Sequence, residues 1–306
     1  MNSIETPSSA KLTRYAWLSI GAAVLTIALK LGAYFLTNSV SLLSDALESL
    51  VNLVTAIVAL IALSVAVRPA DEEFSFGYSK AEYFSSGFEG GMILIAAGSI
   101  FITALPRLFN PQPLEQVGVG LIVSTLASLI NLGVSRVLAS AGKRYGSITL
   151  QADANHLMTD VFTTAGVLVG VTLVSLTGWQ RLDSLVAMLV ATNILVTGLR
   201  LLRHAGSGLM DASLPAQDVK RVREILQSYE KQGIQFHALR TRTAAARGFV
   251  SMHLLVPGEW SVTRAHHLAE QIETEIRQQI PNMAVFTHVE PLDDPISLED
   301  GSLDRE

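Results

Sequence analysis

Long apolar runs separated by short polar breaks fill the first two thirds of the chain. A membrane-spanning helix needs about 20 largely apolar residues. Six segments meet this requirement, and they cover residues 14–36, 41–67, 80–106, 115–140, 149–177 and 182–205. The breaks between them carry turn-forming residues, such as the two prolines of NPQP at 110–113. The pattern therefore predicts six transmembrane helices.

The pattern changes after residue 208, where the chain reads as a small soluble unit. Two segments, 216–233 and 261–281, have helical periodicity. Three others alternate between apolar and polar positions, as strands do, and they are 234–244, 248–258 and 282–292. The expected order is α-β-β-α-β. The predicted fold is an α-helical membrane protein of six transmembrane helices with a C-terminal α+β, ferredoxin-like domain.

Composition and charge set further limits. Only 16% of the 306 residues are charged, against about 25% in a soluble domain. A net charge of −5 without a basic stripe argues against a nucleic-acid partner and leaves the lipid bilayer as the expected surroundings. The chain has no cysteine, so any metal must be held by nitrogen and oxygen atoms.

The distribution of Lys and Arg predicts the orientation in the membrane. Nine basic residues flank the segments on one side and two on the other, which favours a cytoplasmic location for both termini. The polar N-terminus lacks the order of a cleaved signal peptide, so we expect the first apolar run to be retained. The expected divisions are an N-terminal segment 1–13, a transmembrane domain 14–208, a cytoplasmic domain 209–293 and a polar acidic tail 294–306.

Ionisable side chains occur at matching positions in the second and fifth apolar segments. In the second, positions i, i+3 and i+7 are Asp45, Glu48 and Asn52. In the fifth, they are Asp153, His156 and Asp160. This spacing puts each set on one face of a helix. A charge inside a bilayer costs roughly 2.5–3.5 kcal/mol on insertion scales, so both sets are functional-site candidates.

Packed face to face, the two sets can form a metal site. The predicted ligands are Glu48, Asn52, His156 and Asp160. Two carboxylates, one imidazole and one amide oxygen suit a tetrahedral divalent metal, and protons can displace it, with His156 titrating near neutral pH. The alternative is that these residues cap helix ends or form hydrogen bonds with neighbouring residues. Asp45 and Asp153 are nearest the helix starts. They are more readily explained as helix caps, or as residues that orient a metal ligand, than as ligands themselves.

Two further polar residues lie within the predicted spans. Glu89 is either an auxiliary proton carrier or a group facing a polar cavity, and the second interpretation is favoured. Asn131 is interpreted as a helix contact or a cap.

Histidines gather in the soluble part of the chain. His237, His253 and His288 each lie on a predicted strand, and Glu290 follows His288 by two residues on the same strand face. Pairing of the strands would bring these side chains together. A cytoplasmic metal site is therefore predicted, and the alternative is a set of surface histidines on a domain that dimerises without metal.

These features together resemble the cation diffusion facilitator family. The resemblance covers roughly residues 14–292 and includes the six spans, the polar face of the second, His156-x-x-x-Asp160 and the αββαβ domain. The segment FGYSKAE at 76–82 is similar to the YGHGKAE that commonly precedes the third span in this family. The resemblance implies a homodimer that exports divalent cations from the cytoplasm against inward proton flow, in a prokaryotic inner membrane.

The resemblance also assigns roles to individual residues. It implies that Glu48, Asn52, His156 and Asp160 form the transport site. It adds His266 to the cytoplasmic site, donated across the dimer, and it implies that filling this site biases the conformation of the transporter. Lys80 matches a position that pairs with an acid after the sixth span, here Asp211.

The chain departs from the family pattern at two places. Family members usually carry Asp or His at the Glu48 position and Asp at the Asn52 position, so the metal stays open. Zn²⁺ is the leading candidate, with Fe²⁺, Mn²⁺, Co²⁺ and Cd²⁺ as alternatives. A loop metal site of some members would need ligands where this chain has Asp71, Phe74 and Tyr78, so that site is predicted to be absent or very weak.

Two other functions are possible for such a chain. A non-transporting membrane sensor or scaffold, dimerised by its cytoplasmic domain, is disfavoured by the matched polar sets in two spans. A membrane metalloprotease would need a motif such as His-Glu-x-x-His, which does not occur, so an enzyme is not expected.

Overall fold

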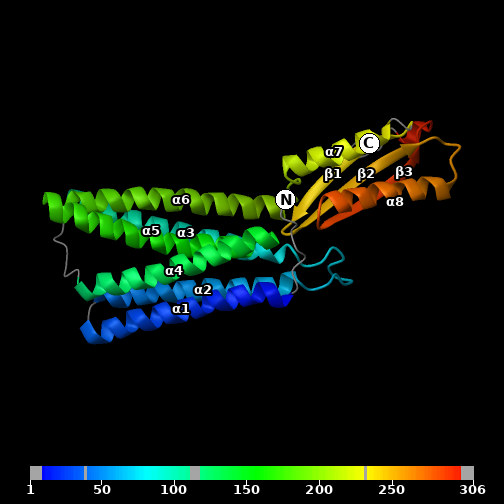
Figure 1. Ribbon diagram of the computed structural model, residues 1–306. Helices are drawn as coiled ribbons and strands as arrows, with labels where there is room; N and C mark the ends of the chain where they lie inside the picture. Colours follow the sequence, from blue (N-terminus) through cyan, green and yellow to red (C-terminus); the bar gives the residue numbers. More distant parts are fainter. Residues whose placement is uncertain (1–8, 38–39, 111–117, 231–232, 298–306) are drawn as a thin grey trace. The chain divides into compact units, whose positions relative to one another are not determined.

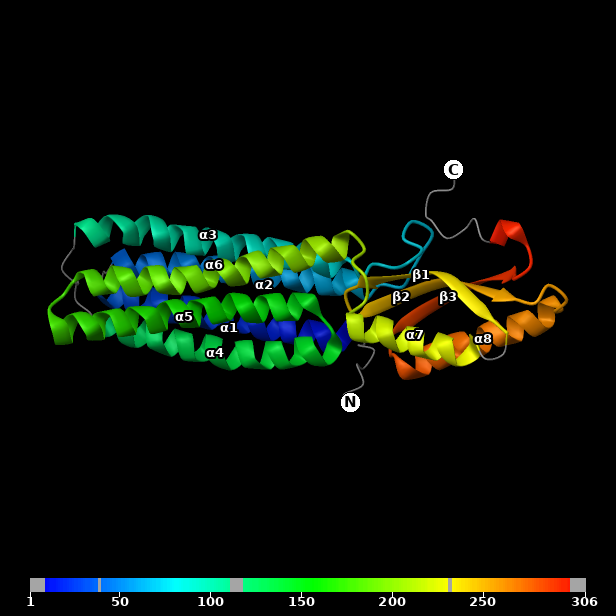
Figure 2. The ribbon, with the colours of Figure 1, turned by 90° about the horizontal axis from the view of Figure 1, so that it is seen from above.

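The computed structural model describes residues 9–37, 40–110, 118–230 and 233–297, which divide between Gly206 and Ser207 into two compact units. The first unit is built from six long helices, which lie side by side along their lengths in both views (Figures 1 and 2). They are α1 (Ser9–Thr37), α2 (Val40–Ala66), α3 (Ala81–Phe109), α4 (Gly118–Tyr145), α5 (Ile148–Thr177) and α6 (Arg181–Leu209).

Five of the six helices are long and apolar enough to cross a membrane over their described residues: α1, α3, α4, α5 and α6. In α2 the described apolar stretch is shorter and covers Asn52–Ala66, although the helix itself has 27 residues. Large apolar side chains such as Phe35, Ile102 and Leu189 are exposed on the outside of this unit. An apolar outer surface on a helix bundle is typical of a protein in lipid.

Glycines bring α6 close to its neighbours. A Cβ atom on Gly198 of α6 would lie 2.7 Å from Leu94 of α3, and one on Gly166 of α5 would lie 2.8 Å from Val190 of α6. Small residues at helix contacts allow this close packing in membranes, where dispersion contacts replace the hydrophobic effect as the driving force.

A tight turn between α4 and α5 fixes the start of α5. Gly146 has the left-handed φ of 64°, which glycine adopts at no steric cost. The hydroxyl of Ser147 then accepts a hydrogen bond from the backbone N–H of Leu150 at 3.3 Å, so Ser147 is the N-cap of α5. Asp153 therefore lies inside the helix and does not cap it.

The second unit contains a three-stranded sheet and two helices. The elements are α7 (Ala216–Glu230), β1 (Gln235–Ala244), β2 (Arg247–Val256), α8 (Val262–Gln279) and β3 (Met283–Pro291). Strand β2 is central, antiparallel to β1 and parallel to β3. Both helices pack on one face of the sheet, where Val250, Met252 and Leu254 meet Ile225 of α7 and Ile272 of α8. The expected αββαβ order is confirmed.

Candidate metal centres

Side chains from α2 and α5 meet in the interior of the transmembrane unit. Oδ1 of Asn52 lies 2.7 Å from Nε2 of His156, and Nδ2 of Asn52 donates a hydrogen bond to Oδ2 of Asp160. Asn52 and His156 are each 5% exposed, so water has little access to these contacts. Three of the four predicted transport-site residues thus lie together, and they join two helices that are far apart in the sequence.

These contacts fix the hydrogen on the imidazole of His156. Because Nδ2 of Asn52 points to Asp160, its Oδ1 faces His156, and an amide oxygen can only accept. Nε2 of a neutral His156 must therefore carry the hydrogen, which leaves the lone pair on Nδ1. Within the described residues, Nδ1 is buried without a hydrogen-bond partner. Nε2 is the nitrogen that lies beside Asn52 and Asp160, so a metal ion shared with these two residues would replace the hydrogen on Nε2.

A third helix also reaches this centre. Nδ2 of Asn131, in α4, donates a 3.0 Å hydrogen bond to the same Oδ2 of Asp160. Asn131 is 5% exposed, and its Oδ1 is buried without a partner among the described residues. Sequence reasoning missed this contact, because a lone amide in a span more often connects two helices. Its carbonyl is a further oxygen that a cation can use.

Two predicted residues of the second span lie outside the described side chains. Glu48 and Asp45 fall in the first turns of α2, where the structure describes the backbone alone. Their roles as a ligand and as an orienting residue stay predictions.

The start of α5 is held by a carboxylate that sequence reasoning did not select. Glu82 of α3 is 3% exposed, and its Oε2 accepts hydrogen bonds from the hydroxyl of Ser147 and, at 3.1 Å, from the backbone N–H of Thr149. Its backbone carbonyl accepts a third bond from the Thr149 hydroxyl. Glu82 is the last residue of the FGYSKAE segment, so its position in that motif was the available signal. It ties α3 to the helix that carries His156.

In the loop between α2 and α3, the carboxylate of Asp71 is engaged by hydrogen bonds from neighbouring residues. Oδ1 of Asp71 accepts the backbone N–H of Phe74 at 2.8 Å, and Oδ2 accepts the Tyr78 hydroxyl at 2.5 Å. The hydrogen bond from Tyr78 holds the pKa of Asp71 below its ordinary value, and the same bond raises the pKa of Tyr78. The rings of Phe74 and Tyr78 are 4.7 Å apart. The positions that would bind a loop metal thus hold one carboxylate, and that carboxylate is engaged.

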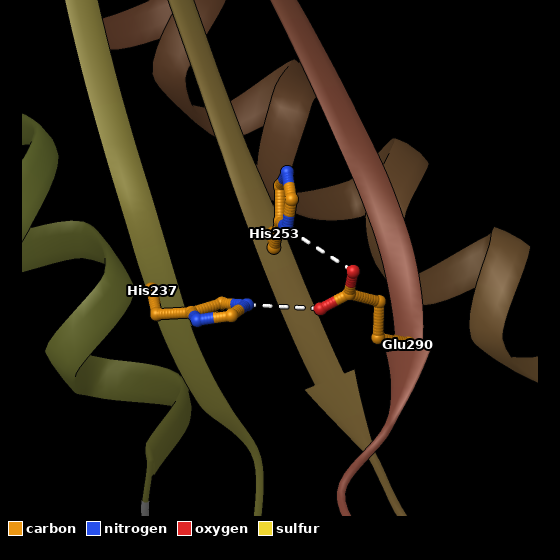
Figure 3. A group of neighbouring side chains, drawn as sticks. All are labelled: His237, His253 and Glu290. Atoms are coloured by element: carbon orange, nitrogen blue, oxygen red, sulfur yellow. Dashed lines mark hydrogen bonds and ion pairs between the residues drawn. The ribbon is translucent and has the colours of Figure 1, made fainter. Parts of the chain in front are cut away.

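A second cluster lies on the face of the sheet opposite α7 and α8. In Figure 3, His237 from β1, His253 from β2 and Glu290 from β3 point toward one another. Nε2 of His237 is 2.9 Å from Oε2 of Glu290, and Nδ1 of His253 is 3.1 Å from Oε1. Glu290 is 6% exposed. These three residues form a group whose ligand atoms all lie within 4.8 Å of one another, as the ligands of one metal ion do.

Nδ1 of His253 is buried and close to Oε1 of Glu290, but it makes no aligned hydrogen bond within the described chain. A cation between the two groups would satisfy both. The ring of His288 lies 5.1 Å from the ring of His253, and its Nε2 is 3.5 Å from Glu290 Oε1. His288 is 66% exposed and therefore lies at the outer rim of the cluster.

Two other predicted residues lie elsewhere. His266 is on α8, exposed beside His267, and does not belong to the group of three in the described chain. Its predicted role is to serve the partner subunit, and that role stays a prediction. Oδ1 of Asp211 accepts a 3.2 Å hydrogen bond from Nη1 of Arg242. The Lys80–Asp211 pairing likewise stays a prediction.

Comparison with known proteins supplies the family. Residues 16–210 match the cation efflux transmembrane domain, and residues 214–292 match the cation efflux protein cytoplasmic domain. The uncharacterized transporter sll1263 of Synechocystis sp. is 53% identical over 290 residues, 94% of each chain. The cation-efflux pump FieF of Serratia proteamaculans is 30% identical over 287 residues, 93% of this chain and 95% of its own.

A solved structure of CzrB in its Zn form matches a smaller part. It covers 28% of this chain and 96% of its own, at 35% identity and a TM-score of 0.26. The match to the cytoplasmic dimerisation domain indicates a homodimer, and the transmembrane match with its apolar helices indicates a multi-pass membrane protein. The resemblance found in the sequence is confirmed: the chain belongs to the cation diffusion facilitator family of cation efflux transporters.

Proposed function

We propose that the chain exports a divalent metal ion from the cytoplasm in exchange for protons, by alternating access. The observation that carries this proposal is the cluster of Asn52, His156 and Asp160 inside the helix bundle, of which Asn52 and His156 are buried. Ionisable groups inside a membrane cost free energy, and their presence there therefore indicates a functional site. Glu48, one helical turn before Asn52, supplies the fourth ligand and a second negative charge.

Zn²⁺ is the proposed substrate, with Fe²⁺, Mn²⁺, Co²⁺ and Cd²⁺ as competitors. A histidine nitrogen favours zinc within a tetrahedral set. The amide of Asn52 in place of a carboxylate, and the nearby oxygen of Asn131, favour a harder ion. The name of the FieF relatives states cation efflux, which is consistent with either choice.

Protons are the proposed counter-ions. Removal of a dication leaves the carboxylates of Asp160 and Glu48 close together in a medium of low dielectric constant, and protons relieve that repulsion. The excess of Lys and Arg on one side supports a protein with both termini in the cytoplasm, set in a prokaryotic inner membrane.

The domain from about residue 209 to 293 serves as a cytoplasmic metal sensor. His237, His253 and Glu290 form its core, His288 closes the rim, and His266 comes from the partner subunit. Binding of metal here would bridge the two cytoplasmic domains and shift the conformation of the transporter, because a ligand stabilises the state that binds it better. The segments 1–13 and 294–306 lie outside the transport and sensor domains in this proposal.

Metal uptake into proteoliposomes with an imposed pH gradient tests the proposal. Wild type should accumulate Zn²⁺ only when the gradient supplies protons to exchange. Asp160→Ala and Glu48→Ala should abolish uptake, whereas Asn155→Ala, an exposed position of α5 beside His156, should transport normally. Uptake at the wild-type rate by Asp160→Ala would contradict the proposal.

The alternative is a membrane sensor or scaffold that binds metal and does not transport it. It predicts metal-dependent changes in the cytoplasmic dimer without flux in the same vesicles. The burial of the Asn52–His156–Asp160 cluster favours the transporter, because a sensor would not need such groups inside the bilayer.

A further inference from the structure

Two buried acids of the transmembrane unit make no hydrogen bond to Asn52, His156 or Asp160 among the described residues. Glu89 of α3 is fully buried, and Asp153 of α5 is 1% exposed. Their helices pack together, since Ile93, one turn after Glu89, shares a core cluster with Ala152, the neighbour of Asp153. The pair of buried acids therefore lies on two helices that pack against each other inside the bundle.

Neither acid has the hydrogen-bond donors that an ionised carboxylate needs. Oε1 of Glu89 accepts a long, 3.4 Å hydrogen bond from Ser85, and Oε2 has no partner. In the described chain both oxygens of Asp153 are buried without an aligned hydrogen bond, and the hydroxyl of Ser19 in α1 lies near them. Within the described chain, in which the side chains of α2 begin at Ser49, no basic group acts on either acid.

Glu82 provides an internal comparison. It lies two turns before Glu89 on the same helix and is almost as deeply buried, yet its Oε2 accepts hydrogen bonds from Ser147 and Thr149. The fold thus surrounds the buried carboxylate of Glu82 with hydrogen-bond donors. It supplies almost none to Glu89 and Asp153, whose buried charges would cost free energy without compensation.

We propose that Glu89 and Asp153 form a proton-binding site, separate from the metal ligands, that carries a counter-proton of metal export. A proton on either acid removes a buried charge that has almost no donors around it. A buried carboxyl group without donors is expected to retain a proton for this reason. The part of the inference that concerns export rests on the proposed function; proton binding by the pair does not.

The position of Asp153 couples this site to the metal. Asp153 precedes His156 by three residues in α5, so the two stand on neighbouring turns of one helix face. A dication at His156 repels a proton on the pair, and by linkage a proton on the pair weakens metal binding. His156 and Glu82 are the next titratable groups along these two helices.

Infrared difference spectroscopy on the full chain in lipid tests proton binding without metal. Acidification should produce a C=O stretch of a protonated carboxylic acid that is lost in Glu89→Gln and lost or shifted in Asp153→Asn. The band should persist in Glu82→Gln, the buried acid with donors, and in Asp160→Asn, which disables the metal centre. Persistence of an unshifted band in both Glu89→Gln and Asp153→Asn would overturn the proposal.

Proton release on Zn²⁺ binding tests the coupling. In weakly buffered solution with a pH indicator, Glu89→Gln should release about one proton fewer per Zn²⁺ than wild type, and Glu89→Asp should restore the release. Unchanged release in Glu89→Gln overturns the proposal. A lower number of Zn²⁺ ions bound by Glu89→Gln also overturns it, because the pair would then be a second metal site. If wild type binds no Zn²⁺, the proposed function fails, while the infrared band still decides proton binding.

Discussion

Oδ1 of Asn52 and Nε2 of His156 lie 2.7 Å apart, and this contact joins the imidazole of α5 to the amide of α2. The amide of Asn52 is itself oriented by its bond to Asp160. An acid at position 52 could not donate to Asp160 and would instead repel it. The neutral amide therefore holds the metal-free centre together at a lower charge than the family's usual Asp would give.

Asn52→Asp should change the metal preference of the protein. The added charge favours the ion-bound state and destabilises the empty centre, since like charges about 4 Å apart interact by roughly 4 kcal/mol at an effective dielectric constant near 20. Relative affinities among Zn²⁺, Fe²⁺ and Mn²⁺ should shift by about tenfold or more, and binding should depend more steeply on pH. A metal-panel titration on purified protein measures this.

Asn155→Asp is the matched control, because Asn155 is exposed and next to His156 in α5. It adds the same charge outside the centre and should leave the preference unchanged. If Asn52→Asp has the same relative metal affinities as wild type, Asn52 is not a ligand and does not set the metal preference.

The membrane centre could be predicted in part, for a physical reason. Spacing along a helix fixes which residues of that helix share a face, so His156 and Asp160 could be joined from the sequence. It does not fix the rotation of a third helix, so the sequence predicts no more than a helix contact or a cap for Asn131. The hydrogen bond from Asn131 to Asp160 appears only once α4 has a definite rotation.

The cytoplasmic cluster depends on a β-bulge in β1 that the sequence pattern does not predict. From the turn, Ala244 pairs with Arg247 and Arg240 with Ser251, and a regular ladder would put His237 opposite Leu254, on the helix-covered face. The register shifts by one residue between His237 and Arg240, where Ala238 has a φ of 50°. A one-residue slip moves a side chain to the other face, so His237 pairs with His253 instead.

Glu82→Ala should weaken the transmembrane unit. It leaves the Ser147 hydroxyl and the Thr149 N–H buried without their acceptor, at a cost of roughly 1–3 kcal/mol. The thermal unfolding temperature in detergent should fall, and Zn²⁺ binding should weaken because α5 carries His156. Glu72→Ala, at an exposed acid of the preceding loop, should match wild type. Equal unfolding temperatures for the two variants would show that Glu82 does not hold α5.

The loop bond between Asp71 and Tyr78 predicts a defined pH dependence. The pKa of Asp71 is below its ordinary 3.8 because Tyr78 donates to the ionised carboxylate. The stabilisation of the loop is therefore complete above pH 3.8 and is lost as the pH falls through the lower, folded pKa. NMR titration of the Asp71 carboxyl should show this depression, and Tyr78→Phe should raise the pKa toward 3.8. If the Asp71 carboxyl titrates identically in Tyr78→Phe and in wild type, the hydrogen bond from Tyr78 is not the cause of the lowered pKa.

Metal binding by the cytoplasmic cluster should stabilise the protein through His253. In an Asp160→Asn background, where the membrane centre is disabled, Zn²⁺ at 100 times its dissociation constant should stabilise the folded state by about 2.7 kcal/mol. His253→Ala should remove this gain, because Glu290 then keeps only His237 and the exposed His288 as partners. His267→Ala, at an exposed histidine of α8, should retain it. Thermal unfolding with and without Zn²⁺ measures the difference, and an equal shift in His253→Ala and His267→Ala would place the bound Zn²⁺ elsewhere.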